Sequence, residues 1–253
     1  MFFDAHCHLQ DARFGAGLEV VLRRAREAGV ARMVCCGTRE SDWDRVLDLA
    51  RRHPEVLPMA GLHPWYVADA APGWLERLEA AFDAGAGAGE CGLDFAEGRP
   101  DPELQEAALI AQLELAIRRN LPVSLHCVKA AERLAAILRK VGLPAAGGLV
   151  HAFSGTLEAA RASQDLGLHL SFGGAVTRPG ARRAAAALAW VRGDRLLLET
   201  DAPDLAPDGV DGLNEPAHLA RIAGAAERIR PGAAAAAWAN ARRLFGQGEL
   251  ERP

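Results

Sequence analysis

Short apolar segments alternate with longer segments of helical period along most of the chain. The short segments are bounded by Gly, Pro or Asp, and the longer ones carry apolar residues at spacings of three and four. This alternation predicts repeated strand–helix units and a parallel sheet. The predicted strands cover residues 2–8, 32–37, 56–63, 86–94, 122–127, 148–153, 169–174 and 195–201.

The longer segments predict helices, among them residues 18–28, 43–52, 103–119, 131–140, 157–166, 216–229 and 233–245. Eight strands with eight or nine helices in 253 residues match the size of a closed barrel, so we predict an α/β protein with a single (β/α)8 TIM barrel as one domain, residues 1–253. An open doubly wound sheet is the alternative. It is disfavoured because the first strand is not followed by a Gly-rich phosphate loop.

Composition narrows the choice of partners and compartment. The net charge of -4 and pI near 6.1 give no overall attraction for nucleic acid, so any polyanion must be held locally. The five cysteines lack a CxxC spacing and fall mostly in apolar runs, which is typical of reduced core residues. With no apolar run of membrane-spanning length and a chemical motif at residue 4, we expect a cytoplasmic protein that does not contact membranes.

Histidines and carboxylates recur where the predicted strands end. His6 and His8 alternate with Cys7, so both project from one face of the first strand. Unpaired ionisable groups are rarely buried in strands, which favours metal binding over a set of unrelated core residues. Imidazole and carboxylate ligands without thiolate suit Mg²⁺, Mn²⁺, Zn²⁺ or a similar divalent ion. The residues expected to converge are His6, His8, Glu90, His126, His151 and Asp201.

These residues lie in motifs that resemble the TatD-like metal-dependent hydrolases, a deoxyribonuclease branch of the amidohydrolase superfamily. The resemblance runs in order through residues 4–8, 61–64, 89–94, 121–126, 151–155, 199–203 and 214–216, and closes at Asn240 and residues 244–245. It implies two metal ions per chain. By this resemblance His6 and His8 hold the first ion with Asp201, His126 and His151 hold the second, and Glu90 bridges them.

The resemblance implies a hydrolase that acts on ester bonds, with DNA ends or short single-stranded nucleic acid as substrate. We hypothesise that a metal-activated water attacks the phosphodiester, that Asp201 is the general base, and that Glu90 is the second catalytic carboxylate. Two departures weaken the nucleic-acid assignment, because Val128 and Leu213 stand where the family commonly has arginine.

Several neighbours of the expected ligands have candidate roles. His63 is a substrate contact, a weak metal ligand or a loop histidine, and Arg178 is the best substitute for the missing arginines. Arg39 and Arg99 are interpreted as solvated loop residues, and Trp65 and Tyr66 as aromatic residues that pack a loop. We expect Glu199, Asp94 and Ser154 to orient the metal ligands.

Two alternatives remain open. The same site could hydrolyse a cyclic amide, a lactone or another small ester, which the missing arginines favour. The chain could also be a metal-binding interaction protein without turnover, although a complete ligand set argues against this. We expect a monomer.

Overall fold

Eight strands follow one another in chain order in the computed structural model, which describes residues 1–246. The neighbours β3–β4, β4–β5, β5–β6 and β7–β8 run parallel. All eight predicted strands are present, whereas the last residues of the predicted single domain, 247–253, lie outside the described part of the chain. The strands are β1 Phe2–Cys7, β2 Val30–Cys36, β3 Val56–Ala60, β4 Gly87–Asp94, β5 Val123–Val128, β6 Gly148–Val150, β7 His169–Phe172 and β8 Leu196–Leu198.

The helices include every helix that the periodicity predicts and two that it does not place, α3 and α7. Helix α7 carries a run of alanines, whose small side chains give little contrast between its buried and exposed faces. Helix α3 follows directly on a segment with Pro and Gly that reads as a loop. The helices are α1 Leu18–Glu27, α2 Glu40–Arg52, α3 Trp74–Asp83, α4 Pro102–Arg119, α5 Ala131–Val141, α6 Leu157–Asp165, α7 Arg182–Trp190, α8 Leu219–Ile229 and α9 Ala233–Phe245.

The chain divides into two compact units. Within the described residues, unit 1 comprises 1–34 and 151–246, and unit 2 comprises Cys35–Val150. In unit 1, β1 packs against the C-terminal helix α9 through Phe3, whose ring stacks on Phe245 at 5.8 Å and meets Trp238 edge-on at 6.1 Å. This contact buries the side chain of Phe3.

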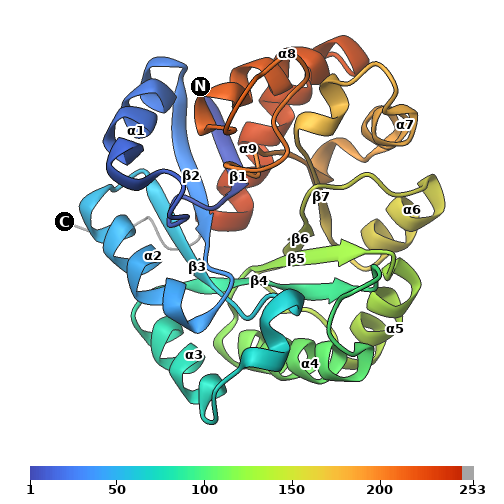
Figure 1. Ribbon diagram of the computed structural model, residues 1–253. Coiled ribbons are helices and arrows are strands. Elements are labelled where there is room, and N and C mark those ends of the chain that lie inside the picture. The colour runs from blue at the N-terminus through green and yellow to red at the C-terminus, as the bar shows by residue number, and fades with distance from the viewer. Residues whose placement is uncertain (247–253) are drawn as a thin grey trace. The chain divides into compact units, whose positions relative to one another are not determined.

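Unit 2 is built around the pair β4–β5, which helix α4 covers (Figure 1). Strand β4 is rich in glycine because β5 passes very close to it. A Cβ atom on Gly92, which has φ +148°, would stand 2.0 Å from the carbonyl oxygen of His126. A side chain at this position is therefore excluded both by the close approach and by the backbone conformation.

The last strands end earlier than the hydrophobic pattern predicts. Strand β6 ends at Val150 and β8 at Leu198, so His151 and Asp201 lie in the segments that follow. Ala152 with φ +45° and Asp201 with φ +58° adopt the left-handed conformation, which cannot continue an extended strand.

All five cysteines are free thiols, and four of them are buried, in agreement with their predicted role as core residues. Among residues 1–246, the longest apolar helix falls short of what is needed to cross a membrane.

Candidate metal centre

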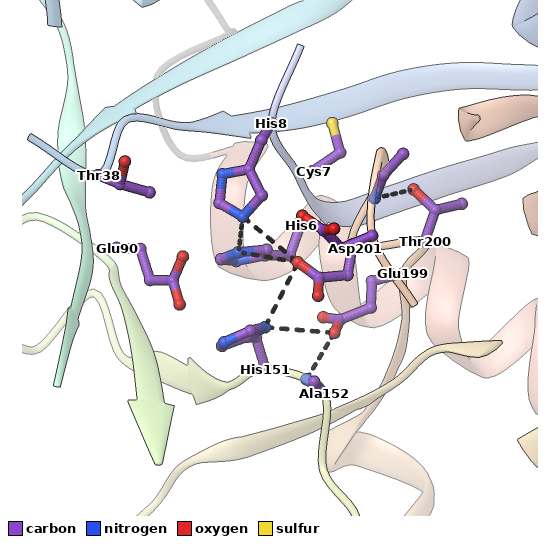
Figure 2. Close-up of polar contacts among 12 residues, drawn as sticks. His6, Cys7, His8, Thr38, Glu90, His151, Ala152, Glu199, Thr200 and Asp201 are labelled. Atoms are coloured by element: carbon purple, nitrogen blue, oxygen red, sulfur yellow. Dashed lines mark hydrogen bonds and ion pairs between the residues drawn. The ribbon is translucent and has the colours of Figure 1, made fainter. Parts of the chain in front are cut away.

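Four side chains of unit 1 converge and form what we call the first cluster: His6, His8, His151 and Asp201. Figure 2 shows them pointing toward one another from β1 and from the segments that follow β6 and β8. The Nε2 atoms of His6 and His8 are 3.3 Å apart, and Oδ1 of Asp201 lies 3.3 Å from His8 Nε2 and 3.8 Å from His6 Nε2. The ring of His151 stacks on His6 with centroids 4.1 Å apart.

The spacing of these donor atoms fits a divalent cation. Ligands ~2.1 Å from a metal ion stand ~3.0 Å apart at neighbouring octahedral corners and ~3.4 Å apart at tetrahedral corners. The atoms of His6, His8 and Asp201 are separated by 3.3 to 3.8 Å, close to these values. A cation among two facing imidazole nitrogens and a carboxylate oxygen would satisfy all three lone pairs at once.

Asp201 is held in an ionised form. Burial alone would raise the pKa of its carboxyl group, but the hydrogen bond with His8 and the charges of His151, His8 and His6 outweigh it and lower the pKa. Its left-handed backbone conformation is one that aspartate tolerates better than most residues. The result is a buried carboxylate aimed at the histidines.

Glu199 lies beside His151, and its role in orienting that ring stays a prediction. Its side chain is fully buried, and its Oε1 lies 3.6 Å from His151 Nδ1 while accepting the backbone N–H of Ala152 at 2.5 Å (Figure 2). A carboxylate beside the nitrogen of a ligating histidine fixes the orientation of its ring. The structure groups His151 with His6 and Asp201, whereas its predicted pairing with His126 stays a prediction.

Asp4 and Thr200 form a buried pair next to the first cluster that the sequence reasoning missed. Asp4 accepts hydrogen bonds from the backbone N–H of Thr200 at 2.8 Å and from its hydroxyl at 2.5 Å. Burial raises the pKa of Asp4 to about 8, against the lowering effect of these hydrogen bonds. The pair ties β1 to the residue before Asp201. An aspartate two residues before His6 on the same face was the available signal.

Three side chains of unit 2 form the second cluster: His63, Glu90 and His126. Oε1 of Glu90 lies 2.9 Å from His126 Nδ1 and 3.2 Å from His63 Nε2, and all three residues are buried. Glu90 sits where the register of β4 against β5 shifts, between Ala88 and Cys91, and its N–H bonds to Gly37 O at 3.0 Å. Such irregularities redirect a side chain near a functional site.

His63 acts as a donor in this cluster because of its tautomer. The backbone N–H of Trp65 donates to His63 Nδ1 at 3.2 Å, so the proton of the neutral ring is on Nε2. That nitrogen faces Glu90 and can donate to it or to a substrate oxygen. His63 is therefore suited to the predicted substrate contact, and Glu90 and His126 remain as cation ligands.

Asp94 contacts the other ring nitrogen of His126, and its role in orienting that ring stays a prediction. Its Oδ2 lies 3.3 Å from His126 Nε2 and accepts the indole N–H of Trp65 at 2.6 Å. Burial acts to raise the pKa of Asp94, but the hydrogen bonds of His126 and Trp65 outweigh it and keep the pKa well below its ordinary value. With Nε2 donating to Asp94, the Nδ1 of His126 carries the lone pair of the ring, which can bind a cation together with Glu90.

Two buried glutamines of α4, also missed by the sequence reasoning, position the strand ends of unit 2. Gln112 accepts the N–H of Leu62 at 2.7 Å and donates to its carbonyl at 3.1 Å, directly before His63. Gln105 accepts the N–H of Asp94 at 2.7 Å and donates to its carbonyl at 2.9 Å. The signal was two amides, two helical turns apart, on the apolar face of the predicted helix.

Four residues around the clusters had candidate roles. Ser154 is exposed and forms no hydrogen bond within residues 1–246, and its orienting role stays a prediction. Arg178 is exposed and bonds to the carbonyl of Ala206 at 3.3 Å. Arg99 is an exposed loop residue, as interpreted, but it also stacks on Trp65 and pairs with Asp94 at 3.4 Å. Trp65 in turn bonds to Asp94 and does more than pack a loop.

Comparisons with known proteins identify the family of the chain. The family model of the TatD related DNases matches residues 3–246. Metal-dependent hydrolase YjjV of Escherichia coli is 36% identical over 226 residues, 87% of each chain, and the 3'-5' ssDNA/RNA exonuclease TatD of Pantoea ananatis is 40% identical over 235 residues, 87% of this chain and 88% of that one.

The crystal structure of YjjV from Escherichia coli superposes with a TM-score of 0.91 at 34% identity, and covers 97% of this chain and 98% of that one. The predicted (β/α)8 barrel and the predicted enzyme class, a metal-dependent hydrolase, are thereby confirmed.

Proposed function

This chain belongs to the TatD related DNase family, and on that premise we propose that it is a metal-dependent phosphodiesterase that acts on ends of single-stranded nucleic acid. The names of several relatives, 3'-5' ssDNA/RNA exonuclease, support this substrate class. The observation that carries the proposal is the geometry of the two clusters. Each brings imidazole and carboxylate donors together at spacings that suit a divalent cation.

Each cluster is proposed to hold one divalent ion. His6, His8 and Asp201 would hold one, with His151 beside them, and Glu90 and His126 would hold the other. The assignment of Glu90 as a bridging ligand follows the family resemblance. Bound divalent ions supply positive charge that this acidic protein lacks, and they lower the pKa of coordinated water.

The surrounding side chains prepare the site for hydrolysis. The ionised carboxylate of Asp201 is the proposed general base, because it is buried and has one oxygen among the histidines of the first cluster. Glu199 keeps the ring of His151 oriented, and Asp94 does the same for His126. The Nε2–H of His63 is the proposed donor to a phosphate oxygen of the substrate.

The test is a screen of the purified protein with Mg²⁺, Mn²⁺ or Zn²⁺ against single-stranded oligonucleotides and a panel of amides and lactones. The proposal expects metal-dependent release of nucleotides and loss of that release in Glu90→Ala. His151→Ala and Asp201→Asn are expected to lose it as well, and retained turnover in both would reject their roles. Oligonucleotides left intact by the wild type under every metal would reject the proposal.

One observation favours a second candidate, the hydrolysis of a small neutral ester, lactone or cyclic amide. Val128 and Leu213 are exposed apolar side chains at positions where the family resemblance predicts arginine. A neutral substrate needs no such cation. The same screen separates the two, since this candidate predicts turnover of the amide or lactone panel and none of the oligonucleotides.

A further inference from the structure

Arg99 lies beside the second cluster on the loop that follows β4. Its guanidinium carbon is 3.8 Å from the centroid of the Trp65 ring, and its Nε is 3.4 Å from Asp94 Oδ2. The same oxygen of Asp94 lies 3.3 Å from Nε2 of His126. One carboxylate thus separates the guanidinium from a proposed cation ligand.

The loop that carries Arg99 is fixed at both ends. The backbone N–H of Ala96 donates to Asp94 Oδ1 at 3.0 Å, and Gln105 of α4 donates to the carbonyl of Pro100 at 2.8 Å. The indole N–H of Trp65 in turn donates to Asp94 at 2.6 Å, which fixes the ring under the guanidinium. The position of Arg99 is therefore set by Trp65, by Asp94 and by the two hydrogen bonds that hold its loop.

The outer edge of this guanidinium is available to a ligand. The Nη atoms of Arg99 form no hydrogen bond with any of residues 1–246, and 34% of its side chain is exposed. Stacking on Trp65 and the contact with Asp94 restrict the orientation of the side chain, so less entropy is lost when an anion binds. A planar pair of N–H donors matches the oxygens of a phosphate group.

The neighbouring strand β5 has an apolar residue, Val128, at the position where the family resemblance predicts an arginine. Val128 of β5 stands directly opposite Asp94 in the strand register, and the N–H of Phe95 bonds to its carbonyl at 2.9 Å. Val128 is apolar and 37% exposed, at a position where the resemblance predicts arginine. Arg99 brings a guanidinium to the same strand end from the adjacent loop.

We infer that Arg99 is the phosphate-binding side chain of this site, that Trp65 supports it from behind, and that its ligand is a phosphate group of the nucleic-acid substrate. This inference rests on the proposed function and specifies how the substrate is held. Arg99 takes the place of Arg178, which was predicted to substitute for the missing arginines. The guanidinium of Arg178 bonds to the carbonyl of Ala206, and both residues belong to unit 1.

The first test compares the hydrolysis of a single-stranded oligonucleotide by the wild type, Arg99→Gln, Arg99→Lys and Arg161→Gln. Arg161 is the matched control because it also lies over a tryptophan, Trp190 at 5.5 Å, on the helices of unit 1. Arg99→Gln should raise KM on the order of tenfold or more with kcat and bound metal unchanged. Arg99→Lys should give an intermediate KM, because lysine keeps the charge and loses the planar donor pair.

Salt dependence supplies a readout that a merely structural role would not change. Loss of one phosphate contact to a single strand should lower the slope of log KM against log salt by ~0.7 in Arg99→Gln and leave it unchanged in Arg161→Gln. A KM and a salt slope in Arg99→Gln equal to those of the control would overturn the inference. A fall in kcat and in bound metal at constant KM would also overturn it, since Arg99 would then act only through Asp94.

Phosphate binding separates this inference from the proposed function. Titration of the metal-loaded wild type and Arg99→Gln with inorganic phosphate should show affinity weaker by about tenfold or more in the variant. If the wild type hydrolyses no oligonucleotide and this difference persists, the proposed function fails and the phosphate site stands. Equal phosphate affinity in the two proteins refutes the phosphate site whatever the substrate.

Discussion

Gln112 offers a test of how helix α4 positions the second cluster. Its amide forms hydrogen bonds with both backbone groups of Leu62, accepting from the N–H at 2.7 Å and donating to the carbonyl at 3.1 Å. Both residues are buried. Gln112→Met keeps the length of the side chain and the helix propensity but removes both partners. A buried backbone group left without a partner costs ~1–3 kcal/mol, so the two together should cost ~2–6 kcal/mol of unfolding free energy.

The assay is urea-induced unfolding followed by circular dichroism, with Leu109→Met as control. Leu109 is fully buried on the same helix, and its replacement by methionine should cost less than ~1.5 kcal/mol because volume is conserved. Gln112→Met should also raise KM for the oligonucleotide, because the strand end before His63 is no longer held. A stability of Gln112→Met within ~0.5 kcal/mol of the control would refute the reasoning.

Three further outcomes follow from the structure. Gly92→Ala should prevent folding of the β4–β5 pair, because its Cβ would stand 2.0 Å from a carbonyl oxygen. The readout is insoluble protein or the loss of the unfolding transition. Gly98→Ala, whose Cβ would have nothing within 4 Å, should fold, and equal behaviour of the two variants would contradict this. Burial raises the pKa of the Cys91 thiol to about 12, so iodoacetamide at pH 8 should leave Cys91 unmodified in the native protein and alkylate it in urea, as mass spectrometry would show; rapid native labelling would speak against it. Removal of bound metal by chelation should lower Tm, and return of the metal should restore it. An unchanged Tm would argue against metal binding by the two clusters of the folded protein.

The hydrophobic pattern predicted most of the fold, and the ionisable residues at the ends of its apolar runs include most of those that form the two clusters. Strands that end in histidine or a carboxylate, such as the one before Asp94, were visible because an ionisable residue closes an apolar run. The pattern predicted strands that extend beyond the ends of β6 and β8. His151 and Asp201 follow these strands, in segments that contain residues in the left-handed conformation. Conformation of that kind depends on tertiary contacts such as the bond from Ala152 to Glu199.

Partners that depend on loop conformation were beyond the sequence pattern. Arg99 could be placed after a strand, but its stack on Trp65 depends on the loop bonds at Ala96 and Pro100. The glutamines of α4 were likewise visible as polar residues on an apolar face. Their partners are backbone atoms, which nearly every residue has, so the sequence does not indicate which ones the glutamines bond to.

Metal content tests the central claim most directly. Elemental analysis of the purified protein, saturated with Mn²⁺ or Zn²⁺ and freed of excess ion, should give two ions per chain. His8→Ala in the first cluster and His126→Ala in the second should each give one, with Arg161→Gln as control. A single ion in the wild type, or a stoichiometry that neither histidine variant lowers, would contradict the account.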